Sequence, residues 1–230
     1  MRVALVTVGD ELLAGETVNT NAAWLGEQLT ARGASVERST AVPDRVADIA
    51  RVVSEYRAEH DAVVVTGGLG PTHDDVTMAA VAAAFGRDLE ESEEALAWLE
   101  AHGGYEREDL AEGTARLPAG ARPLHNEVGV APGCVIDGVY VLPGVPDEMK
   151  AMFESVRREF TGTRLSVATV DVDEPESALL DRFAELRERF DVTVGSYPGD
   201  HVRVRLRGED EREVERAAAW LRERVDLVSE

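Results

Sequence analysis

Two hydrophobic periods alternate along the first 85 residues. Short runs of β-branched and apolar side chains predict strands, and stretches with an apolar side chain every three or four positions predict helices. The strands are predicted at residues 2–8, 36–40 and 62–66, and the helices at residues 20–32, 44–59 and 76–85. This repeated order predicts an α/β fold, in which a three-layer, mostly parallel sheet carries helices on both faces.

The middle of the chain is more polar. Residues 91–102 and 106–116 predict two highly charged helices, which form an insertion that could serve as a lid or an oligomer contact. Residues 135–142 predict two short strands joined by a tight Asp-Gly turn. A further helix is predicted at residues 146–160.

The pattern changes after residue 162. Beyond it, the predicted elements are a strand at 165–172, a helix at 176–189, strands at 192–197 and 202–207, and a helix at 209–224. This βαββα order predicts a small α+β domain at residues 163–230, after a larger domain at residues 1–162.

The segment TGGLGPTHDD, residues 66–75, carries the strongest indication of function. It joins a predicted strand to a predicted helix, where backbone N–H groups can bind a phosphate. Its glycines allow a ligand to approach closely, and Asp74 and Asp75 could hold a divalent metal against the phosphates. The segment matches neither a Walker loop nor the G-x-G-x-x-G pattern. The alternative is an ordinary turn in which one aspartate caps the helix.

Three further loops look suited to ligand contact, and most of the four loops fall at one predicted edge of the sheet, where α/β proteins bind their ligands. The first, GDELLAG at residues 9–15, offers carboxylates to a metal and leads to a helix that Asn19 or Thr20 could cap. The second is NEVGVAPG at residues 126–133, and the third is LPGVPDEM at residues 142–149. Each loop alone is a weak indication, because glycine and proline usually only shape turns.

The composition is strongly acidic. The chain has 45 Asp and Glu against 24 Lys and Arg, a formal net charge of −21, and Lys150 is its only lysine. Such a surface repels nucleic acid and anionic membranes, so we expect neither as a partner. Because concentrated salt screens self-repulsion, the charge also predicts a halophilic source.

Other features predict a cytoplasmic protein. The single cysteine, Cys134, excludes an intramolecular disulfide framework and is expected to be a small buried strand residue rather than a catalytic one. The start of the chain does not read as a signal peptide, and no apolar run is long enough to span a bilayer.

Taken in order, these segments resemble the family of competence/damage-inducible protein A (CinA), on the molybdopterin-binding fold that MogA, MoaB and MoeA share. The resemblance rests on GDELL at residues 9–13, NTN at 19–21, residues 66–75, APG at 131–133 and LPGVP at 142–146. Many bacterial members carry lysine where this chain has His73. The GPTHDD version is more similar to the N-terminal region of eukaryotic FAD synthetases, and that likeness continues through GSYP at residues 195–198.

The resemblance implies a pocket for a pterin or a nucleotide, in a homo-oligomer such as a dimer or trimer. Similar members hydrolyse the pyrophosphate bond of ADP-ribose or FAD with a divalent metal (Mg²⁺, Mn²⁺ or Co²⁺) and potassium stimulation. Relatives in molybdenum-cofactor synthesis bind molybdopterin instead, and acidic residues matching Asp44 and Asp75 line their pocket. Asp44 could otherwise be the N-cap of its helix. Neither the deamidase domain of bacterial CinA proteins nor the adenylyltransferase half of FAD synthetase is expected here.

A site hypothesis follows from these residues. A diphosphate would lie on the glycine segment, cradled by Gly67, Gly68, Gly70 and Thr72. The predicted metal ligands are Asp75, Asp44 and Asp10, and the metal would lower the pKa of a bound water for in-line attack. His73 would donate to a phosphate or only hydrogen-bond its own loop. The further predicted ligand contacts are Asn21, Asn126, Gly133, Pro143, Gly144 and Glu148.

The favoured function is thus a metal-dependent pyrophosphatase acting on ADP-ribose, FAD or a similar dinucleotide, with Asp75, Asp44 and His73 as its catalytic residues. A non-catalytic molybdopterin-binding protein is the main alternative. A regulatory protein whose pocket has decayed is the third.

Overall fold

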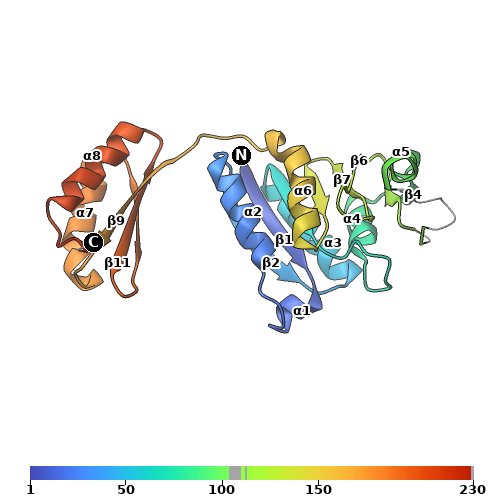
Figure 1. Ribbon diagram of the computed structural model, residues 1–230, viewed down its shortest axis with the longest axis horizontal. Coiled ribbons are helices and arrows are strands. Elements are labelled where there is room, and N and C mark those ends of the chain that lie inside the picture. Colours follow the sequence, from blue (N-terminus) through green and yellow to red (C-terminus); the bar gives the residue numbers. More distant parts are fainter. Residues whose placement is uncertain (104–109, 112, 229–230) are drawn as a thin grey trace. The chain divides into compact units, whose positions relative to one another are not determined.

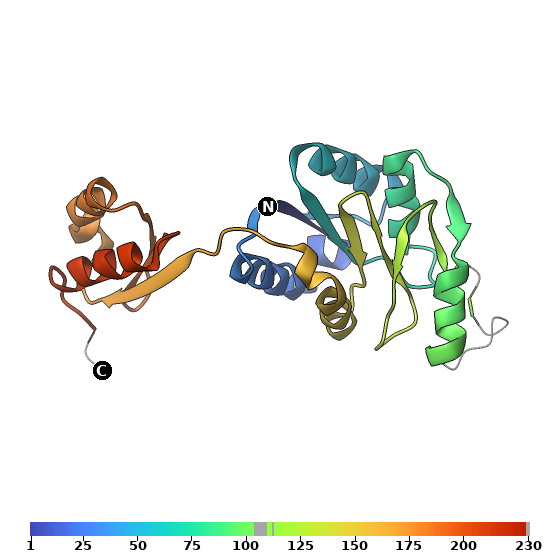
Figure 2. The same cartoon turned by 90° about the horizontal axis from the view of Figure 1, so that it is seen from above.

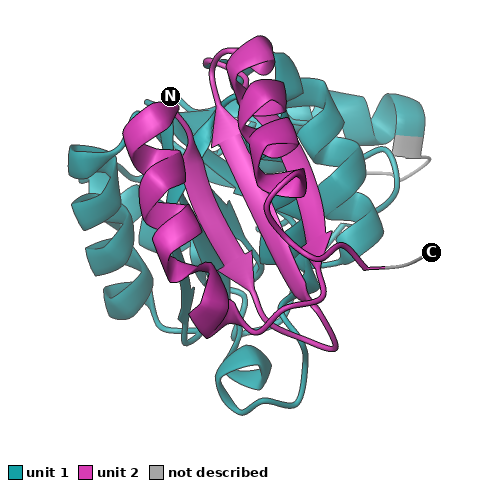
Figure 3. Ribbon diagram, turned by 90° about the vertical axis from the view of Figure 1, so that its left-hand side faces the viewer, with its two compact units in different colours: residues 1–162 teal, residues 163–230 magenta. Residues whose placement is uncertain are grey.

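The chain forms two compact units, residues Met1–Gly162 and Thr163–Glu230, which Figure 3 shows in different colours. The computed structural model describes residues 1–103, 110–111 and 113–228. The boundary between the units falls where the sequence pattern changes. Each unit is described by itself below.

A six-stranded sheet forms the centre of the larger unit, in the order β2-β1-β3-β8-β7-β6 (Figure 1). Four neighbouring strands are parallel: β1 (Arg2–Val8), β2 (Ser35–Val42), β3 (Ala62–Thr66) and β8 (Val139–Leu142). The edge strands β7 (Gly133–Ile136) and β6 (Arg122–Leu124) run antiparallel to their neighbours. The sheet is therefore mostly parallel, as the alternation of strands and helices predicted.

Helices cover both faces of this sheet (Figure 2). The side chains of β1 alternate between the two cores, since Val6 joins α3 (Val46–Glu59) and α4 (Thr77–Phe85) on one face. Leu5 joins α2 (Thr20–Ala31) and α6 (Pro146–Val156) on the other. Because a strand turns successive side chains to opposite faces, an almost wholly apolar strand such as β1 must be covered on both sides.

Several short elements were not predicted from the sequence. They are α1 (Asp10–Leu13), β4 (Leu89–Glu91), β5 (Arg116–Pro118) and β6. The predicted helix at 91–102 is α5 (Glu93–Trp98), which continues as the π-helical turn η1 (Leu99–Gly103). The helix at 146–160 stops at Val156 and gives way to the 3₁₀ turn η3 (Arg157–Glu159).

The predicted helix at 106–116 includes residues 106–109 and 112, which lie outside the described residues. Its described C-terminal part is not helical: residues 113–115 form a turn, and Arg116 begins β5. That part of the prediction is wrong because β5 pairs with β4, a contact between segments far apart in sequence. The local periodicity of the sequence does not indicate such a long-range strand pairing.

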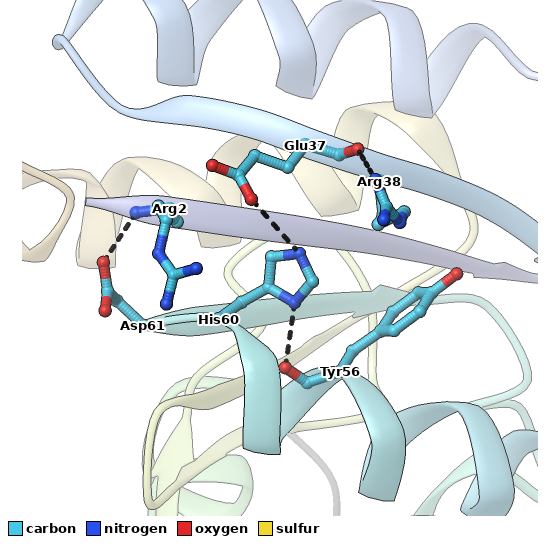
Figure 4. A network of polar contacts seen from close by, with 6 residues as sticks. All are labelled: Arg2, Glu37, Arg38, Tyr56, His60 and Asp61. Atoms are coloured by element: carbon cyan, nitrogen blue, oxygen red, sulfur yellow. Dashed lines mark hydrogen bonds and ion pairs between the residues drawn. The ribbon is translucent and has the colours of Figure 1, made fainter.

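A polar network fixes the amino-terminal edge of the sheet (Figure 4). The buried ring of His60 lies 3.0 Å from the Tyr56 carbonyl through Nδ1 and 3.8 Å from a Glu37 carboxylate oxygen through Nε2. Asp61 accepts a 2.7 Å hydrogen bond from the Arg2 backbone N–H, and that bond lowers the pKa of the Asp61 carboxyl. These contacts tie β1, β2 and β3 together at the end of the sheet remote from the glycine segment.

The smaller unit is a three-stranded antiparallel sheet in the order β10-β11-β9. Its strands are β9 (Ser166–Val172), β10 (Thr193–Tyr197) and β11 (Val202–Gly208). The helices α7 (Leu180–Arg189), preceded by the 3₁₀ turn η4 (Glu176–Leu179), and α8 (Glu211–Arg222) pack on one face. Phe183, Leu186 and Leu221 belong to its separate core.

None of the helices in the described part of the chain is both long and apolar enough to cross a membrane.

Cys134 offers a direct test of the core. It lies in β7 with no exposed surface, its Sγ is 3.7 Å from Met78 Sδ, and burial raises the pKa of its thiol to about 12. Because the thiolate is the reactive form, we expect an aromatic disulfide reagent at pH 8 to leave the native protein unmodified and to modify one thiol in denaturant. Prompt, stoichiometric modification of the native protein would contradict this packing.

Candidate functional site

Four loops meet at the carboxyl edge of the parallel strands. They follow β1, β2, β3 and β8 and lead into α1, α3, α4 and α6. The order of the strands reverses between β1 and β3, because the chain moves from β1 outward to β2 and then returns to the other side of β1. Such a reversal opens a crevice for ligands beyond the strand ends. We call this region the loop edge.

Gly67 lets the loops at this edge pack closely together. Its φ of +102° is unfavourable for any residue with a side chain, and an added Cβ would lie 2.3 Å from the Val8 carbonyl oxygen. Its N–H donates to the Leu142 carbonyl at 3.2 Å. A Cβ on Gly144 would in turn lie 3.1 Å from the Gly67 Cα. The ends of β1, β3 and β8 therefore meet at a glycine that no other residue can replace without displacement.

The next glycine approaches the start of α4. Gly68 has a φ of +63°, and its carbonyl accepts a 3.2 Å hydrogen bond from the Thr77 N–H. Thr77 is fully buried, and its Oγ1 has no hydrogen-bond partner within the described residues. A Cβ on Gly68 would lie 2.5 Å from that hydroxyl. The loop thus keeps a hydroxyl group without a partner directly beside its backbone.

Asp75 closes the same loop on itself. One carboxylate oxygen accepts hydrogen bonds from the Thr72 N–H at 2.9 Å and from the Thr72 hydroxyl at 2.5 Å. The carboxylate also lies against Gly70, where an added Cβ would be 2.6 Å away from it. The helix α4 has Val76 as its N-cap, with no side-chain capping bond. The alternative in which Asp74 or Asp75 caps that helix is therefore wrong.

Carboxylates from the loops after β1, β2 and β3 gather at the same edge. Asp44 accepts a 2.8 Å hydrogen bond from the Asp10 N–H. Partial burial raises the pKa of Asp44, and the negative charges of Asp10, Glu11 and Asp74 raise it further. We call these four residues the acidic cluster. The N-cap of α3 is Arg45, so Asp44 is not the helix cap that one reading of the sequence allowed.

The acidic cluster contains two of the three predicted metal ligands. Asp44 and Asp10 are brought together, whereas the Asp75 carboxylate turns toward Gly70 and Thr72. No three His, Cys, Asp or Glu side chains in residues 1–103, 110–111 and 113–228 converge closely enough to hold a metal ion. Any cation bound here would need oxygen ligands from its substrate as well as from the protein.

Two cavities flank the loop after β3, which contains Gly67, Gly68 and Gly70 and is called the glycine loop below. The larger, of about 450 Å³, is bounded by the loop after β3, the first turns of α4, and residues 130–132. Gly68, Gly70, Thr72 and Asp75 line it. The smaller, of about 110 Å³, lies over the ends of β1, β3 and β8 and contains Gly67 and Gly144 in its wall. The Gly67–Gly68 peptide therefore borders both cavities.

Asn21 lies in the wall of the smaller cavity. Its Nδ2 donates to the Gly144 carbonyl at 2.7 Å, while its buried Oδ1 has no partner within the described residues. The neighbouring Asn19 is the N-cap of α2, because its Oδ1 accepts from the Ala22 N–H at 3.1 Å. Its amide also donates to Thr7 Oγ1 at 2.8 Å. Asn19 is thus structural, whereas Asn21 has a buried oxygen without a hydrogen-bond partner among the described residues.

Asn126 and Glu148 shape the loop that bounds the larger cavity. Asn126 is 2% exposed and donates to the Ala131 carbonyl at 3.1 Å and to Glu148 Oε2 at 2.7 Å. Its Oδ1 accepts from the backbone N–H groups of Val128 and Gly129. These bonds satisfy the Asn126 side chain within the protein and position residues 130–132.

Three other predicted contacts lie away from the cavity walls. His73 has a fully exposed side chain, 3.9 Å from the Asp74 carboxylate, and lines neither cavity. Gly133 belongs to β7, where a Cβ would lie 2.3 Å from the Val141 carbonyl oxygen and 2.4 Å from Met152 Sδ. Pro143 is buried behind the loop. These three residues therefore lie at the loop edge without lining either cavity.

Sequence reasoning missed two residues, one in the wall of the larger cavity and one buried beside Gly68. Among the described residues that line this cavity, Arg116 alone carries a fixed positive charge. Its place in a predicted helix hid it, although an arginine close to a phosphate site is a recognisable signal. Thr77, which follows the aspartate pair, was missed because its unpaired hydroxyl is evident only after folding.

The fold and the loop edge define an α/β domain with a glycine-lined candidate site for a ligand. Comparison with known proteins agrees. The family described as "probable molybdopterin binding domain" matches residues 4–162, and the one described as "FAD synthase, middle domain" matches residues 164–228. The chain belongs to the molybdopterin-binding domain family, in which its relatives include CinA-like proteins.

Individual relatives cover most of the chain. A protein of Thermococcus kodakarensis is 40% identical over 248 residues, covering 97% of each chain. A CinA-like protein of Citrifermentans bemidjiense is 38% identical and covers 98% of this chain, which spans 58% of that protein. The crystal structure of CinA from Thermoplasma acidophilum, of unknown function, matches with a TM-score of 0.64 at 40% identity. It covers 69% of this chain and 97% of its own.

The packing around Gly67 predicts a contrast between two glycines. Gly15 also has positive φ, +74°, but an added Cβ there meets nothing within 4 Å. In Gly15→Ala, left-handed backbone strain should lower the free energy of unfolding by only roughly 1–2 kcal/mol. Gly67→Ala should lower it clearly more in denaturant unfolding, because its added Cβ also meets the Val8 carbonyl. Equal losses for the two variants would contradict the close contact of the strand ends.

The acidic cluster predicts a dependence of stability on pH. A raised pKa means that Asp44 binds a proton more tightly when folded than at its ordinary value of 3.8. Its ionisation therefore lowers stability as pH rises from 3.8 through the raised pKa, and the loss persists at neutral pH. Asp44→Asn should raise the melting temperature at pH 7, and the difference should shrink toward zero as the pH falls below 3.8.

The control for this measurement is Asp181→Asn, which alters an exposed carboxylate on α7. It should leave the melting temperature nearly unchanged throughout the range. An Asp44→Asn difference that does not vary with pH would mean that the variant acts through packing instead of charge.

Proposed function

We propose that this chain is a metal-dependent pyrophosphatase that acts on ADP-ribose, FAD or a similar dinucleotide. The observation that carries the proposal is the Gly67–Gly68 peptide, which borders two cavities of unequal size. A dinucleotide has two arms joined by a diphosphate, so a diphosphate on this loop can place one arm in the larger cavity.

Backbone groups and Thr72 supply the contacts to the diphosphate. The glycines expose their peptides to the ligand, and the Thr72 hydroxyl lies at the wall of the larger cavity. Arg116, across the same cavity, offers a positive charge to a phosphate. These contacts hold the phosphorus in place for attack by water, which forms a new P–O bond while the bridging P–O bond breaks.

The charges at the loop edge support the proposal that a cation binds there. The negative charges that raise the pKa of Asp44 are not balanced within the acidic cluster, and a diphosphate nearby would add to the repulsion. The Asp44 carboxylate accepts a 2.8 Å hydrogen bond from the Asp10 backbone N–H. The carboxylates of these two residues would hold Mg²⁺, Mn²⁺ or Co²⁺ together with phosphate oxygens. Such an ion, when bound, neutralises phosphate charge and lowers the pKa of its water, and K⁺ would stimulate the reaction.

Asp75 then serves as the group that fixes the phosphate loop. Its bonds to Thr72 set the position of that hydroxyl against the ligand. The exposed side chain of His73 would reach a phosphate only after a rotation about its own bonds. We therefore assign Asp75 the larger share of the effect on the rate.

Binding of molybdopterin without turnover is the second candidate. The family match over residues 4–162 favours it, and so does the engagement of Asp75 in two hydrogen bonds, which leaves that carboxylate poorly placed as a base. A pterin ring would occupy the larger cavity and its phosphate the glycine loop. Retention of a pterin through purification would distinguish this candidate.

The setting of the protein is part of the proposal. The net charge of −21 suits a concentrated-salt cytoplasm, so activity assays belong in molar KCl. A homo-oligomer, dimer or trimer, is proposed for the working state.

Release of AMP tests the pyrophosphatase directly. With ADP-ribose, FAD or NAD in molar KCl, we expect AMP release that needs Mg²⁺, Mn²⁺ or Co²⁺ and stops with EDTA. Asp75→Asn should lower kcat about 100-fold, because a neutral amide oxygen accepts the two Thr72 hydrogen bonds more weakly than the carboxylate does and positions the loop less firmly. Asp181→Asn, remote in sequence and in the other unit, is the matched control and should keep the wild-type rate.

Each result separates the candidates. Full metal-dependent release in Asp75→Asn would remove that residue from the mechanism. No release from any of the three substrates by the wild-type protein would leave the molybdopterin-binding function as the better account.

A further inference from the structure

The sheet of the smaller unit has one face that its own helices do not cover. Val202, Val204 and Leu206 of β11 point into the core with α7 and α8. The alternate residues of each strand therefore point to the other face. That open face consists of Val167, Thr169, Asp171, Arg203, Arg205, Arg207, Thr193, Gly195 and Tyr197.

Three arginines follow one another along the middle strand of the open face. Arg203 is paired, because its Nε donates to Asp171 at 3.0 Å. Arg205 lies opposite Gly195 and Thr169, and Arg207 lies opposite Thr193 and Val167. Within the described residues neither of these two forms an ion pair. Unpaired arginines side by side are unusual in a chain with a net charge of −21 and favour an anionic ligand.

An aromatic ring lies beside these arginines. A Cβ added to Gly195 would lie 3.2 Å from Tyr197 Cε2 and 3.3 Å from its Oη, so the ring rests on the glycine backbone. The Tyr197 side chain is nevertheless 48% exposed. One ring face therefore packs against the strand, and the other is free to stack on a flat ligand. Any side chain at position 195 would displace the ring.

A cavity of about 360 Å³ joins these groups. Its wall includes Tyr197, Pro198, Gly199, His201, Arg203 and Arg205. Asp200 lies at the same wall, and Asp171 lies 3.4 Å from His201 Nε2. These two carboxylates limit the positive charge of the cavity, so it suits a ligand with one phosphate better than a polyanion.

We propose that this cavity binds a nucleoside monophosphate, with its base stacked on Tyr197 and its phosphate held by Arg205 and Arg203. The site is separate from the loop edge, because all of its residues belong to the unit that begins at Thr163. Stacking of a base on an aromatic ring and a bidentate arginine–phosphate contact are independent contributions, so they can be removed one at a time. Single-stranded RNA offers the same groups, but the net charge opposes a polyanion.

Calorimetric titration of the full chain with AMP tests the proposal. EDTA is present throughout, so that any metal-dependent binding at the loop edge is suppressed. Arg205→Gln should weaken AMP about 10-fold, the equivalent of one charge-assisted hydrogen bond. Its matched control, Arg187→Gln, changes an exposed arginine of α7, on the helical side of the unit, and should have no effect.

Two further variants test the stacking contact. Tyr197→Ala and Gly195→Val should each weaken AMP while leaving the weak binding of inorganic phosphate unchanged, whereas Tyr197→Phe should bind AMP as the wild type does. Loss of phosphate binding along with AMP in Tyr197→Ala would show that the ring only supports the fold of the cavity, and would overturn the stacking role.

The remaining outcomes concern the ligand and the place of binding. AMP binding that Asp75→Asn abolishes and Arg205→Gln leaves intact would assign it to the loop edge and overturn the proposal. Binding of an oligoribonucleotide at least 10-fold tighter than AMP, lost in Arg205→Gln, would replace the monophosphate by RNA. A failed AMP-release assay leaves this result unaffected, because the titration requires no turnover.

Discussion

Close packing of the strand ends is the constraint on which the loop edge depends. Parallel strands deliver their carboxyl ends to one edge, and there the Val8 carbonyl lies 2.3 Å from where a Gly67 Cβ would be. The same glycine donates to Leu142, and Gly144 approaches it from the third strand. Because position 67 has no side chain, the ends of β1, β3 and β8 can pack together there. The Gly67–Gly68 peptide borders both cavities at this contact.

Charge is distributed unevenly over the molecule, with acidic side chains gathered at the loop edge and arginines on the open face of the smaller unit. At the loop edge, carboxylates from loops after β1, β2 and β3 are close enough to raise the pKa of Asp44. On the open face of the smaller unit, two arginines lie without acidic partners among the described residues. Each arrangement is unfavourable alone and becomes favourable when an ion of the opposite sign binds. A folded protein keeps such groups at a cost to its own stability.

Much of the fold follows from periodicity alone. The core strands and helices are long, and each has a buried face that repeats at its own period, so the sequence predicts them within a few residues. The three-residue strands β4, β5 and β6 are too short to show a period, and β4 pairs with β5 across 24 residues or more of chain. Their position depends on tertiary contacts, which a local pattern does not contain.

The position of the site in the fold was predictable from the sequence, but the contacts of its side chains were less so. Glycines at strand ends identified the edge, because few other residues allow the chain to turn there. The directions of the side chains were not predictable in the same way. Asp75 turns back to Thr72, His73 points to solvent, and Asn126 forms hydrogen bonds within its own loop. The glycine spacing does not specify these directions. They depend on the hydrogen-bond partners that each loop offers in its folded conformation, such as the Thr72 N–H for Asp75 and the Gly129 N–H for Asn126.

The separate cores of the two units have an evolutionary consequence. Every residue that lines the two loop-edge cavities lies in residues 1–162, and every residue of the arginine-lined cavity lies after residue 162. A substitution in the wall of one cavity therefore changes only residues of its own unit. Mutations that alter the two sets of cavity residues are thus separate events, on which selection can act independently.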